Sequence, residues 1–151
     1  MTKPKLQPKD WKAEALFWKK EALKTREPRT RLSPERSSIV RRFNLPADSD
    51  GKELKMYVNV GLYDDGRPGE VFIKADKVGS FQAGILDALA IAISIALQYG
   101  APISLFIEKF VHTKFEPAGL TGDASFPMVS SPLDMIAKWW QTKFGEKSNG
   151  P

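Results

Sequence analysis

The sequence predicts an α+β fold, in which a small antiparallel sheet of about three strands packs against a buried helix and two or three further helices. Two patterns carry this prediction. Apolar and polar residues alternate in short runs between residues 39 and 75, as in strands, and residues 80–99 form one long apolar segment. The chain has 151 residues, 42% hydrophobic and 27% charged, which suits one globular domain with a core.

The N-terminal segment is predicted to be a basic helix followed by an arm. Residues 1–9 hold two prolines and three lysines and are expected to form a flexible tail. Asp10 suits the N-cap of a helix that has lysines on one face. The opposite stripe is Trp11, Ala15, Trp18 and Ala22. The run PRTRLSPERSS (28–38) is expected to be an extended linker or arm. We therefore divide the chain into a tail and helix (1–27), a domain (28–144) and a disordered tail (145–151).

Three strands follow in order, joined by turns. IVRRFNL (39–45) is a short strand, and LKMYVNVGLY (54–63) and EVFIKA (70–75) alternate more clearly. The Asp65-Gly66 pair between the second and third strands is a hairpin signal. Asp64 and Asp65 are therefore interpreted as turn residues, not as metal ligands.

The apolar helix is predicted to begin near Ser80 and to end at Gly100, a suitable C′ residue. A helix that is hydrophobic on every side is expected to be buried on every side, by a sheet and by other helices or a second subunit. Asp87 lies within it, and we expect a structural role, capping a backbone segment or meeting Arg67. Small residues that permit close approach favour oligomerisation through this helix or its neighbours: Ala83, Gly84, Ala88, Ala90, Ala92 and Ala96.

The C-terminal part is predicted to hold two more helices. APISLFIEKFVHTKF (101–115) is the shorter, and a loop without a regular period follows it. The last helix spans 131–144, with Ser131 as cap, Pro132 at its first position and Asp134 in its first turn. Of the adjacent Trp139 and Trp140, one is expected in the core, and the other against a neighbouring subunit or in a base pocket.

Composition excludes several classes of protein. The chain has no cysteine, which excludes disulfides, thiolate zinc sites, iron–sulfur clusters and cysteine nucleophiles. No N-terminal signal is visible, and residues 84–99 are interpreted as too short to span a bilayer. We expect a cytoplasmic protein without membrane contact. The charge is uneven: residues 1–45 hold 13 Lys/Arg against 5 Asp/Glu, whereas residues 46–151 are mildly acidic.

Several segments occur in an order that is typical of one family. They are PRTRLSPERSSIVRRF, VGLYDDGRPGEVFIK, GSFQAGILDALAIAISIALQYGAPI, EKFVHTKFEPAGLTG and PLDMIAKWW. Together, from about Pro28 to Phe144, they resemble the TSCPD domain, the C-terminal accessory domain of adenosylcobalamin-dependent (class II) ribonucleotide reductases. The resemblance implies a small antiparallel sheet packed with helices and a link to nucleotide metabolism. In that family the chemistry lies in a separate barrel with cysteines, so the resemblance implies no reductase activity here.

The stretch KADKVGSFQ is the first candidate binding site. A helix N-terminus exposes unpaired N–H groups to an anion such as phosphate, and Lys74 or Lys77 could add charge. Gly79 would allow close approach, and Ser80 could donate a hydrogen bond. The alternative is that Ser80 only caps the helix and that the lysines are solvated. The predicted ligand-binding set is Lys74, Lys77, Gly79, Ser80, Gln82, Arg67, His112 and Lys114.

His112 is the only histidine. It could pair with Glu108 or Glu116, or stack on a base. Neither a nucleophile–base pair nor metal-ligand spacing accompanies it, so we predict no catalytic residue, no metal, no cofactor and no enzyme activity.

The arm is the second candidate site, because arginine binds phosphates in a bidentate manner and stacks on bases. Its nucleic-acid or partner-binding residues are predicted to be Arg29, Arg31, Arg36, Arg41 and Arg42. They could equally bind the chain's own acidic part.

Three functions remain open at this point. The first is a non-catalytic, oligomeric protein that binds a nucleotide or cyclic nucleotide for regulation or sequestration. The second is nucleic-acid binding through residues 1–45. The third is an adaptor that docks on a reductase or a replication protein through the helix WKAEALFWKKEAL.

Overall fold

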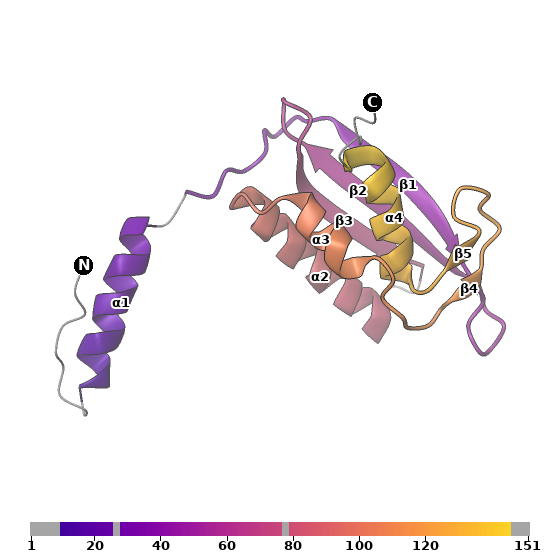
Figure 1. The fold of residues 1–151 in the computed structure, drawn as a ribbon, viewed down its shortest axis with the longest axis horizontal. Helices are drawn as coiled ribbons and strands as arrows, with labels where there is room; N and C mark the ends of the chain where they lie inside the picture. Colours follow the sequence, from indigo (N-terminus) through magenta and orange to yellow (C-terminus); the bar gives the residue numbers. More distant parts are fainter. Residues whose placement is uncertain (1–9, 26–27, 77–78, 146–151) are drawn as a thin grey trace, which may run out of the picture.

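The computed structural model describes residues 10–25, 28–76 and 79–145. This part of the chain forms the predicted α+β fold (Figure 1), which is confirmed. Its elements are α1 (Trp11–Thr25), β1 (Ser38–Leu45), β2 (Leu54–Leu62), β3 (Pro68–Ala75), α2 (Phe81–Gln98), α3 (Ile103–Phe110), β4 (Gly119–Leu120), β5 (Met128–Val129) and α4 (Pro132–Phe144).

β1, β2 and β3 form an antiparallel sheet in that order, as the alternation predicts. The β2–β3 turn confirms the hairpin signal. Gly66 has φ +85°, a conformation that glycine adopts without steric cost, and its N–H donates to the Tyr63 carbonyl at 2.9 Å. Local turn chemistry therefore forms the hairpin, and the β2–β3 register then shifts by one residue between Gly61 and Leu62.

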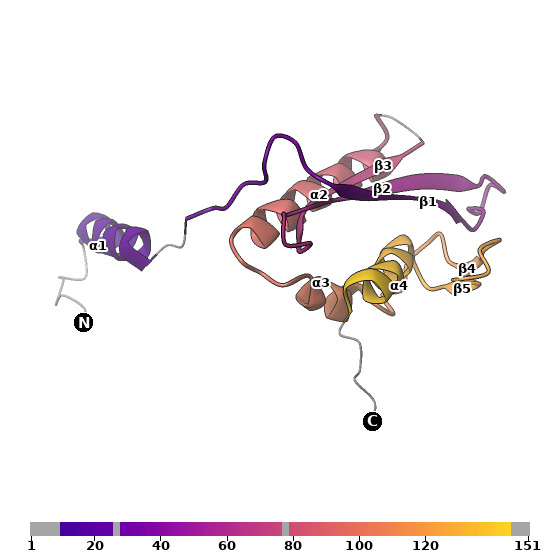
Figure 2. The same ribbon diagram turned by 90° about the horizontal axis from the view of Figure 1, so that it is seen from above.

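The core lies between one face of this sheet and α4, with α3 beside α4 (Figure 2). Trp139 meets Phe43 of β1 edge-on, with ring centroids 5.5 Å apart. Trp139 and Trp140 are both buried in the described chain, although the sequence suggested a partner surface or pocket for one of them. The inward side chains of the strands are Phe43, Leu45, Met56, Val58, Val60, Val71 and Ile73.

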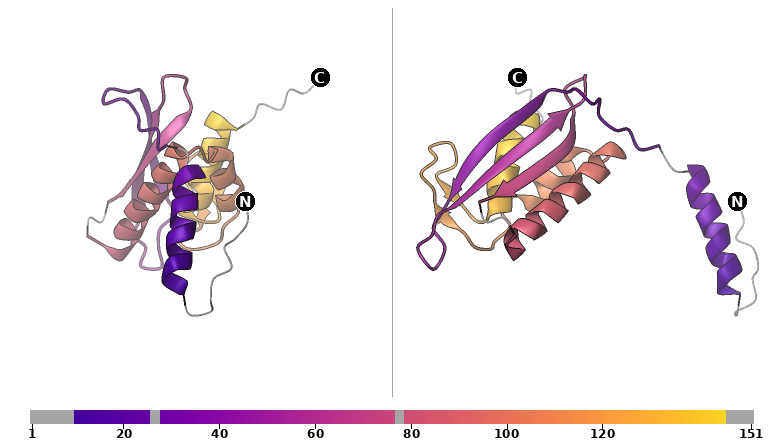
Figure 3. Two further views of the ribbon diagram at one scale, coloured as in Figure 1. Left: turned by 90° about the vertical axis from the view of Figure 1, so that its left-hand side faces the viewer. Right: turned by 180° about the vertical axis from the view of Figure 1, so that it is seen from behind.

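α2 runs along β3, the edge strand of the sheet (Figures 1 and 3). Both predicted ends are confirmed. The Ser80 hydroxyl accepts from the Ala83 N–H at 3.2 Å, and Gly100 has φ +94°. The Gly100 N–H donates to the Leu97 carbonyl and the Ala101 N–H to the Ala96 carbonyl, which is a Schellman motif.

The prediction that α2 is buried on every side is wrong for the single chain. Only Ala90, Ile93, Leu97 and Gln98 are buried, because the sheet edge covers just one stripe of the helix. Phe81 is 83% exposed, and Ile85, Ile91 and Ile95 are exposed as well. Asp87 is also only half-buried, so it is not the buried carboxylate that the sequence suggested.

By length and composition alone, α2 could cross a membrane, which corrects the estimate made from residues 84–99. It is the single such helix in the described ranges. Core helices of globular proteins share this length and composition. Here α2 packs on β3 and carries an ion pair between Asp87 and Lys74.

The helix predicted over residues 101–115 is shorter than expected, because α3 ends at Phe110. Two residues later His112 takes φ +63°, which no helix continues. The loop that follows is less irregular than predicted: β4 and β5 pair across it, with Gly119 opposite Val129.

α1 begins after Asp10, whose carboxylate accepts from the Ala13 N–H at 3.4 Å, as predicted for an N-cap. In Figures 1 and 3 the helix lies away from the sheet, and Trp11 and Trp18 are exposed. The predicted flexible tail, residues 1–9, lies outside the described residues, as does the predicted disordered tail, residues 145–151, apart from Gly145, which caps α4.

Candidate ligand-binding cleft

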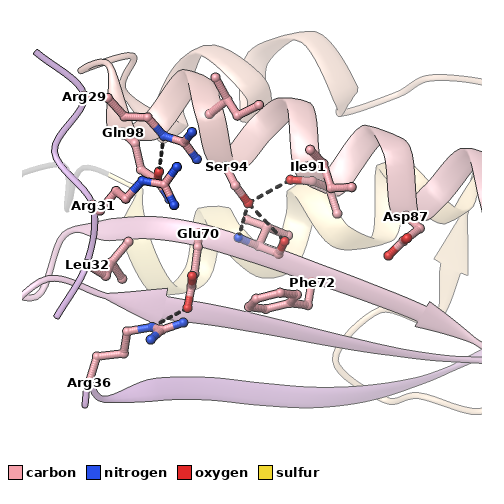
Figure 4. Close-up of a pocket in the computed structure, with 13 residues that line it drawn as sticks. Arg29, Arg31, Leu32, Arg36, Glu70, Phe72, Asp87, Ile91, Ser94 and Gln98 are labelled. Carbon is pink, nitrogen blue, oxygen red and sulfur yellow. Dashed lines mark hydrogen bonds and ion pairs between the residues drawn. The ribbon is translucent and has the colours of Figure 1, made fainter. Parts of the chain in front are cut away.

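A cleft of about 490 Å³ lies between the arm (residues 28–37), β3 and α2 (Figure 4). Arg29, Arg31 and Arg36 reach it from the arm, and Phe72 and Ile91 supply apolar wall from β3 and α2. Cations beside an aromatic ring suit a ligand that combines an anionic group with a flat apolar part. The remaining lining residues are Leu32, Glu70, Val71, Asp87, Ala90, Ser94, Ile95 and Gln98.

Gln98 at the end of α2 fixes the arm. Its side-chain oxygen accepts from Arg29 Nε at 2.7 Å, and its Nε2 donates to the Gly69 carbonyl at 3.1 Å. Its backbone carbonyl accepts from the Thr30 N–H at 2.9 Å. Gln98 is buried, so these bonds also satisfy polar groups that water cannot reach.

The β2–β3 hairpin holds the arm from the other side. The Tyr63 hydroxyl donates to the Thr30 carbonyl at 2.6 Å, and Leu32 packs close to Gly69. Because both contacts involve residues 30–32, the three arginines around them are held by the fold and are not part of a free linker.

The charges in the cleft are partly paired. Arg36 binds Glu70 through Nε and donates from Nη1 to the carbonyls of Ser33 and Pro34. Arg29 is held by Gln98 through Nε. Arg31 has no ion-pair partner within the described chain. Asp87 is neutralised by Lys74, with 2.7 Å between Oδ1 and Nζ. The arm side of the cleft is therefore the cationic side.

Ser94 joins α2 to the edge strand at the back of the cleft (Figure 4). Its hydroxyl accepts from the Val71 N–H at 2.8 Å and lies 3.1 Å from the Val71 carbonyl and 2.8 Å from the Ala90 carbonyl. An edge strand leaves such backbone groups unpaired, and here a helix side chain occupies them.

The anion site predicted from the sequence is only partly assembled. Lys74, Gly79 and Ser80 line a smaller hollow of about 280 Å³ next to Asp87. There Lys74 is paired with Asp87, and Ser80 caps α2, as in the alternative interpretation. Gln82 is exposed and does not line the hollow, and Lys77 lies outside the described residues.

The other predicted ligand-binding residues lie elsewhere. Arg67 is at the opposite end of β3 from Lys74 and pairs with Asp65 across the turn, at 2.7 Å, so it does not meet Asp87. His112 and Lys114 are exposed in the segment after α3. Arg67 and Lys74 are only seven positions apart in the sequence, but the extended strand β3 lies between them and keeps their side chains apart.

His112 acts on the described structure through its backbone. Its N–H donates to Asp134 Oδ1 at 2.7 Å, whereas its exposed imidazole lies 3.9 Å from that oxygen. Asp134 is fully buried and also accepts from the Ser130 N–H and from Lys138 Nζ, each at 2.9 Å. Burial raises the pKa of Asp134, but these donors outweigh it and hold the pKa below its ordinary value.

Of the five predicted arm arginines, two lie on β1 instead of the arm. Arg41 binds Asp123 and lies over the rings of Phe43 and Phe126, so it joins β1 to the β4–β5 loop. Arg42 points to the opposite side of β1 and is exposed. The alternative that arginines bind the chain's own acidic groups thus fits Arg36 and Arg41.

Sequence reasoning missed Phe72, Glu70 and Gln98 as cleft residues. Phe72 is outward-facing in an alternating strand, and an exposed aromatic residue there was an available signal. No sequence signal pointed to Gln98, because it holds the arm through Arg29, which lies 69 positions earlier in the chain. In the part of the chain that the structure describes, no group of three potential metal ligands occurs.

Comparison with known proteins gives one family. The model of the TSCPD domain matches residues 28–143. A vitamin B12-dependent ribonucleotide reductase of Rhodopirellula baltica is 44% identical over 111 residues, which are 74% of this chain and 10% of that protein. Enzymes of the same name from Streptantibioticus cattleyicolor and Bradyrhizobium diazoefficiens are 38% and 42% identical, over 83% and 54% of this chain and 20% and 7% of their own length.

The chain spans no more than a fifth of these reductases, so it corresponds to an accessory segment of each. No solved structure matches it. The matched residues include the arm, β3 and α2 and therefore the whole cleft. This chain belongs to the TSCPD domain family.

Proposed function

We propose that this protein is a non-catalytic, cytoplasmic binding domain, and that it holds a nucleotide or nucleotide-derived anion in the arginine-lined cleft for regulation or sequestration. The observation that carries the proposal is the meeting of Arg29, Arg31 and Arg36 over a cleft with an exposed aromatic wall, Phe72. Membership of a family whose relatives are ribonucleotide reductases supports a ligand of nucleotide type.

The proposed binding mode uses each cleft residue for one task. Arg31 binds the phosphate, and the terminal nitrogens of Arg29 add to it, because Gln98 occupies only Nε. The base lies against Phe72 and Ile91. Since Arg29 is already anchored by Gln98, its side chain loses little entropy on binding, whereas Arg31 is ordered by the ligand.

Calorimetry and thermal unfolding with nucleoside mono- and triphosphates and cyclic nucleotides test the proposal. A ligand that binds only the folded state raises Tm. Arg31→Ala is expected to weaken binding about ten-fold. Lys143→Ala, which removes an exposed cation on α4, is expected to leave binding unchanged. If none of these compounds binds, the proposal is wrong.

We also propose that the protein forms a homo-oligomer through α2. One exposed stripe of α2 has apolar residues in alternating steps of four and three positions, the spacing of the contact positions in a coiled coil. The stripe consists of Phe81, Ile85, Ala88, Ala92 and Ile95. In an antiparallel pair of α2 helices, Ile85 of each copy would face Ile95 of the other, and Ala88 would face Ala92. Contiguous exposed apolar residues of this kind mark interaction surfaces.

Light scattering coupled to gel filtration tests this assembly. Ala88→Glu places a charge at the centre of the seam and is expected to give monomers. Leu120→Glu, a change at an exposed apolar residue of β4, is the control and is expected to leave the mass unchanged. A wild-type protein that is already monomeric would contradict the proposal.

A second candidate function is docking on a reductase. The observation that favours it is that the relatives carry this segment within a much longer chain, so contact with the rest of such an enzyme is a natural use of its surface. Co-elution with a purified vitamin B12-dependent ribonucleotide reductase tests it, and separate elution would count against it.

A further inference from the structure

Within the described residues, no helix packs across the outer face of the three-stranded sheet, and α2 borders this face along β3 (Figure 2). On most proteins such a face is polar, yet here two aromatic rings stand on it: Tyr57 is 45% exposed and Phe72 is 44% exposed. The outward residues of the three strands are Val40, Arg42 and Asn44, Lys55, Tyr57 and Asn59, and Glu70, Phe72 and Lys74.

The strand register places the two rings beside each other. Tyr57 pairs with Lys74, and Asn59 pairs with Phe72, so Tyr57 and Phe72 are diagonal neighbours on adjacent strands. Diagonal residues on one face lie about 7–8 Å apart, within the span of two successive unstacked bases. Arg42 flanks Tyr57 from β1 in the same row.

A hollow of about 350 Å³ adjoins this face, between the arm, β2 and β3. Asn59 and Phe72 line it together with Glu35 and the Arg36–Glu70 ion pair, so a ring and an amide meet at one space. An amide can donate to and accept from the edge of a base that stacks on the ring.

The charge of the face is positive. Arg42 and Lys55 have no ion-pair partner in the described chain, whereas Glu70 is paired with Arg36 and the neighbouring Asp87 with Lys74. Glu35 lines the adjoining hollow, so the unpaired positive charge lies on β1 and β2, at Arg42 and Lys55. A ligand that matches such a surface has several anionic groups for the cations and flat rings that stack on the aromatic side chains.

We infer that the outer sheet face binds single-stranded nucleic acid, with bases stacked on Tyr57 and Phe72 and the phosphates beside Arg42 and Lys55. Every base has a face that can stack, so this mode tolerates different sequences and requires unpaired strands. DNA and RNA share the chemistry. Phe72 also lines the arginine cleft, but Tyr57 and Arg42 do not, so variants of these two residues test the inference separately from the proposed function.

Fluorescence anisotropy of the full chain with labelled oligothymidylate and oligouridylate tests the inference. We expect binding that weakens steeply with salt, because phosphate contacts release counterions. Tyr57→Ala is expected to weaken it about ten-fold, and Tyr57→Phe, which keeps the ring, to retain it. Arg42→Ala is expected to weaken binding and to reduce the salt dependence by about one counterion.

Matched controls lie outside the face. Phe115→Ala removes an aromatic residue that is also 45% exposed, and Lys143→Ala removes an exposed cation, so both are expected to bind as the wild type does. Comparison of the two oligonucleotides decides between DNA and RNA. Absence of binding, or binding that Tyr57→Ala and Arg42→Ala both leave intact, would overturn the inference, even if mononucleotides bind in the cleft.

Discussion

Asp134 shows how much a single buried side chain can hold together. Its carboxylate takes hydrogen bonds from the segment after α3, from the turn before α4 and from Lys138 on α4. The left-handed backbone at His112 persists because that N–H has a fixed, charged acceptor.

Asp134→Asn is expected to lower the free energy of unfolding by about 3 kcal/mol, because an amide cannot accept from all of these donors and the ion pair with Lys138 is lost. Chemical denaturation measures it. Asp64→Asn, at an exposed turn residue, is expected to change little. Equal stability of both variants would contradict the role given to Asp134.

Gly69 is required for the arm because of close approach. A Cβ there would lie 2.6 Å from Tyr63 Cε2 and 2.8 Å from Leu32 Cδ1. Gly69→Ala is therefore expected to cost about 1–3 kcal/mol and to increase amide exchange in the arm, because Leu32 must move. Gly84→Ala is the matched control, since a Cβ there meets nothing within 4 Å. Unchanged exchange in the arm would show that the hairpin does not hold it.

At the scale of elements, the packing of α2 against β3 positions the arginine-lined cleft, because both elements form its walls. Ser94 gives the edge strand a polar partner, and the apolar residues around it pack the helix against the strand. The helix therefore covers an edge of the sheet, and one of its faces is left to solvent or to a partner.

Ser94→Ala removes the acceptor of the Val71 N–H and is expected to destabilise the fold by about 1–2 kcal/mol. Faster hydrogen exchange of the Val71 amide, seen by NMR, is the direct measurement. Ser104→Ala, on the exposed side of α3, corrects for the higher helix propensity of alanine. If both substitutions act alike, the Ser94 hydroxyl does not hold the edge.

At the scale of the whole molecule, two carboxylates join distant segments and make stability depend on pH. Burial raises the pKa of Asp123, but the Ser125 N–H and Arg41 outweigh it, so that its pKa, like that of Asp134, lies below the ordinary value of 3.8. A lowered pKa in the folded state stabilises the protein above the unfolded-state pKa.

This stabilisation is expected to be fully present well above pH 3.8 and to be lost as the pH falls from there through the lower, folded-state values. Urea unfolding across that range measures it. Asp134→Asn is expected to flatten the pH dependence. A wild-type curve that is flat below pH 3.8, or a variant with the same slope, would contradict it.

The sequence determined the strands, the caps and the family, since these depend on residues close together in the chain. Alternation placed the three strands, Ser80, Ser131 and Gly100 placed helix ends, and the ordered motifs gave the TSCPD resemblance, which the family match confirms. Such signals act over a few positions, so they can be interpreted without knowing the fold.

The tertiary structure decided which charges are used and which surfaces are free. Arg29 meets Gln98, Arg41 meets Asp123 and Lys74 meets Asp87, so these three basic residues, which look available in the sequence, are engaged. The sequence predicts too much burial for α2 because the hydrophobicity of a helix face does not specify which element packs against it. Only the tertiary structure shows that the sheet edge covers one stripe of the helix. These pairings join segments far apart in the chain, and the geometry of the sheet, not local residue preference, sets them.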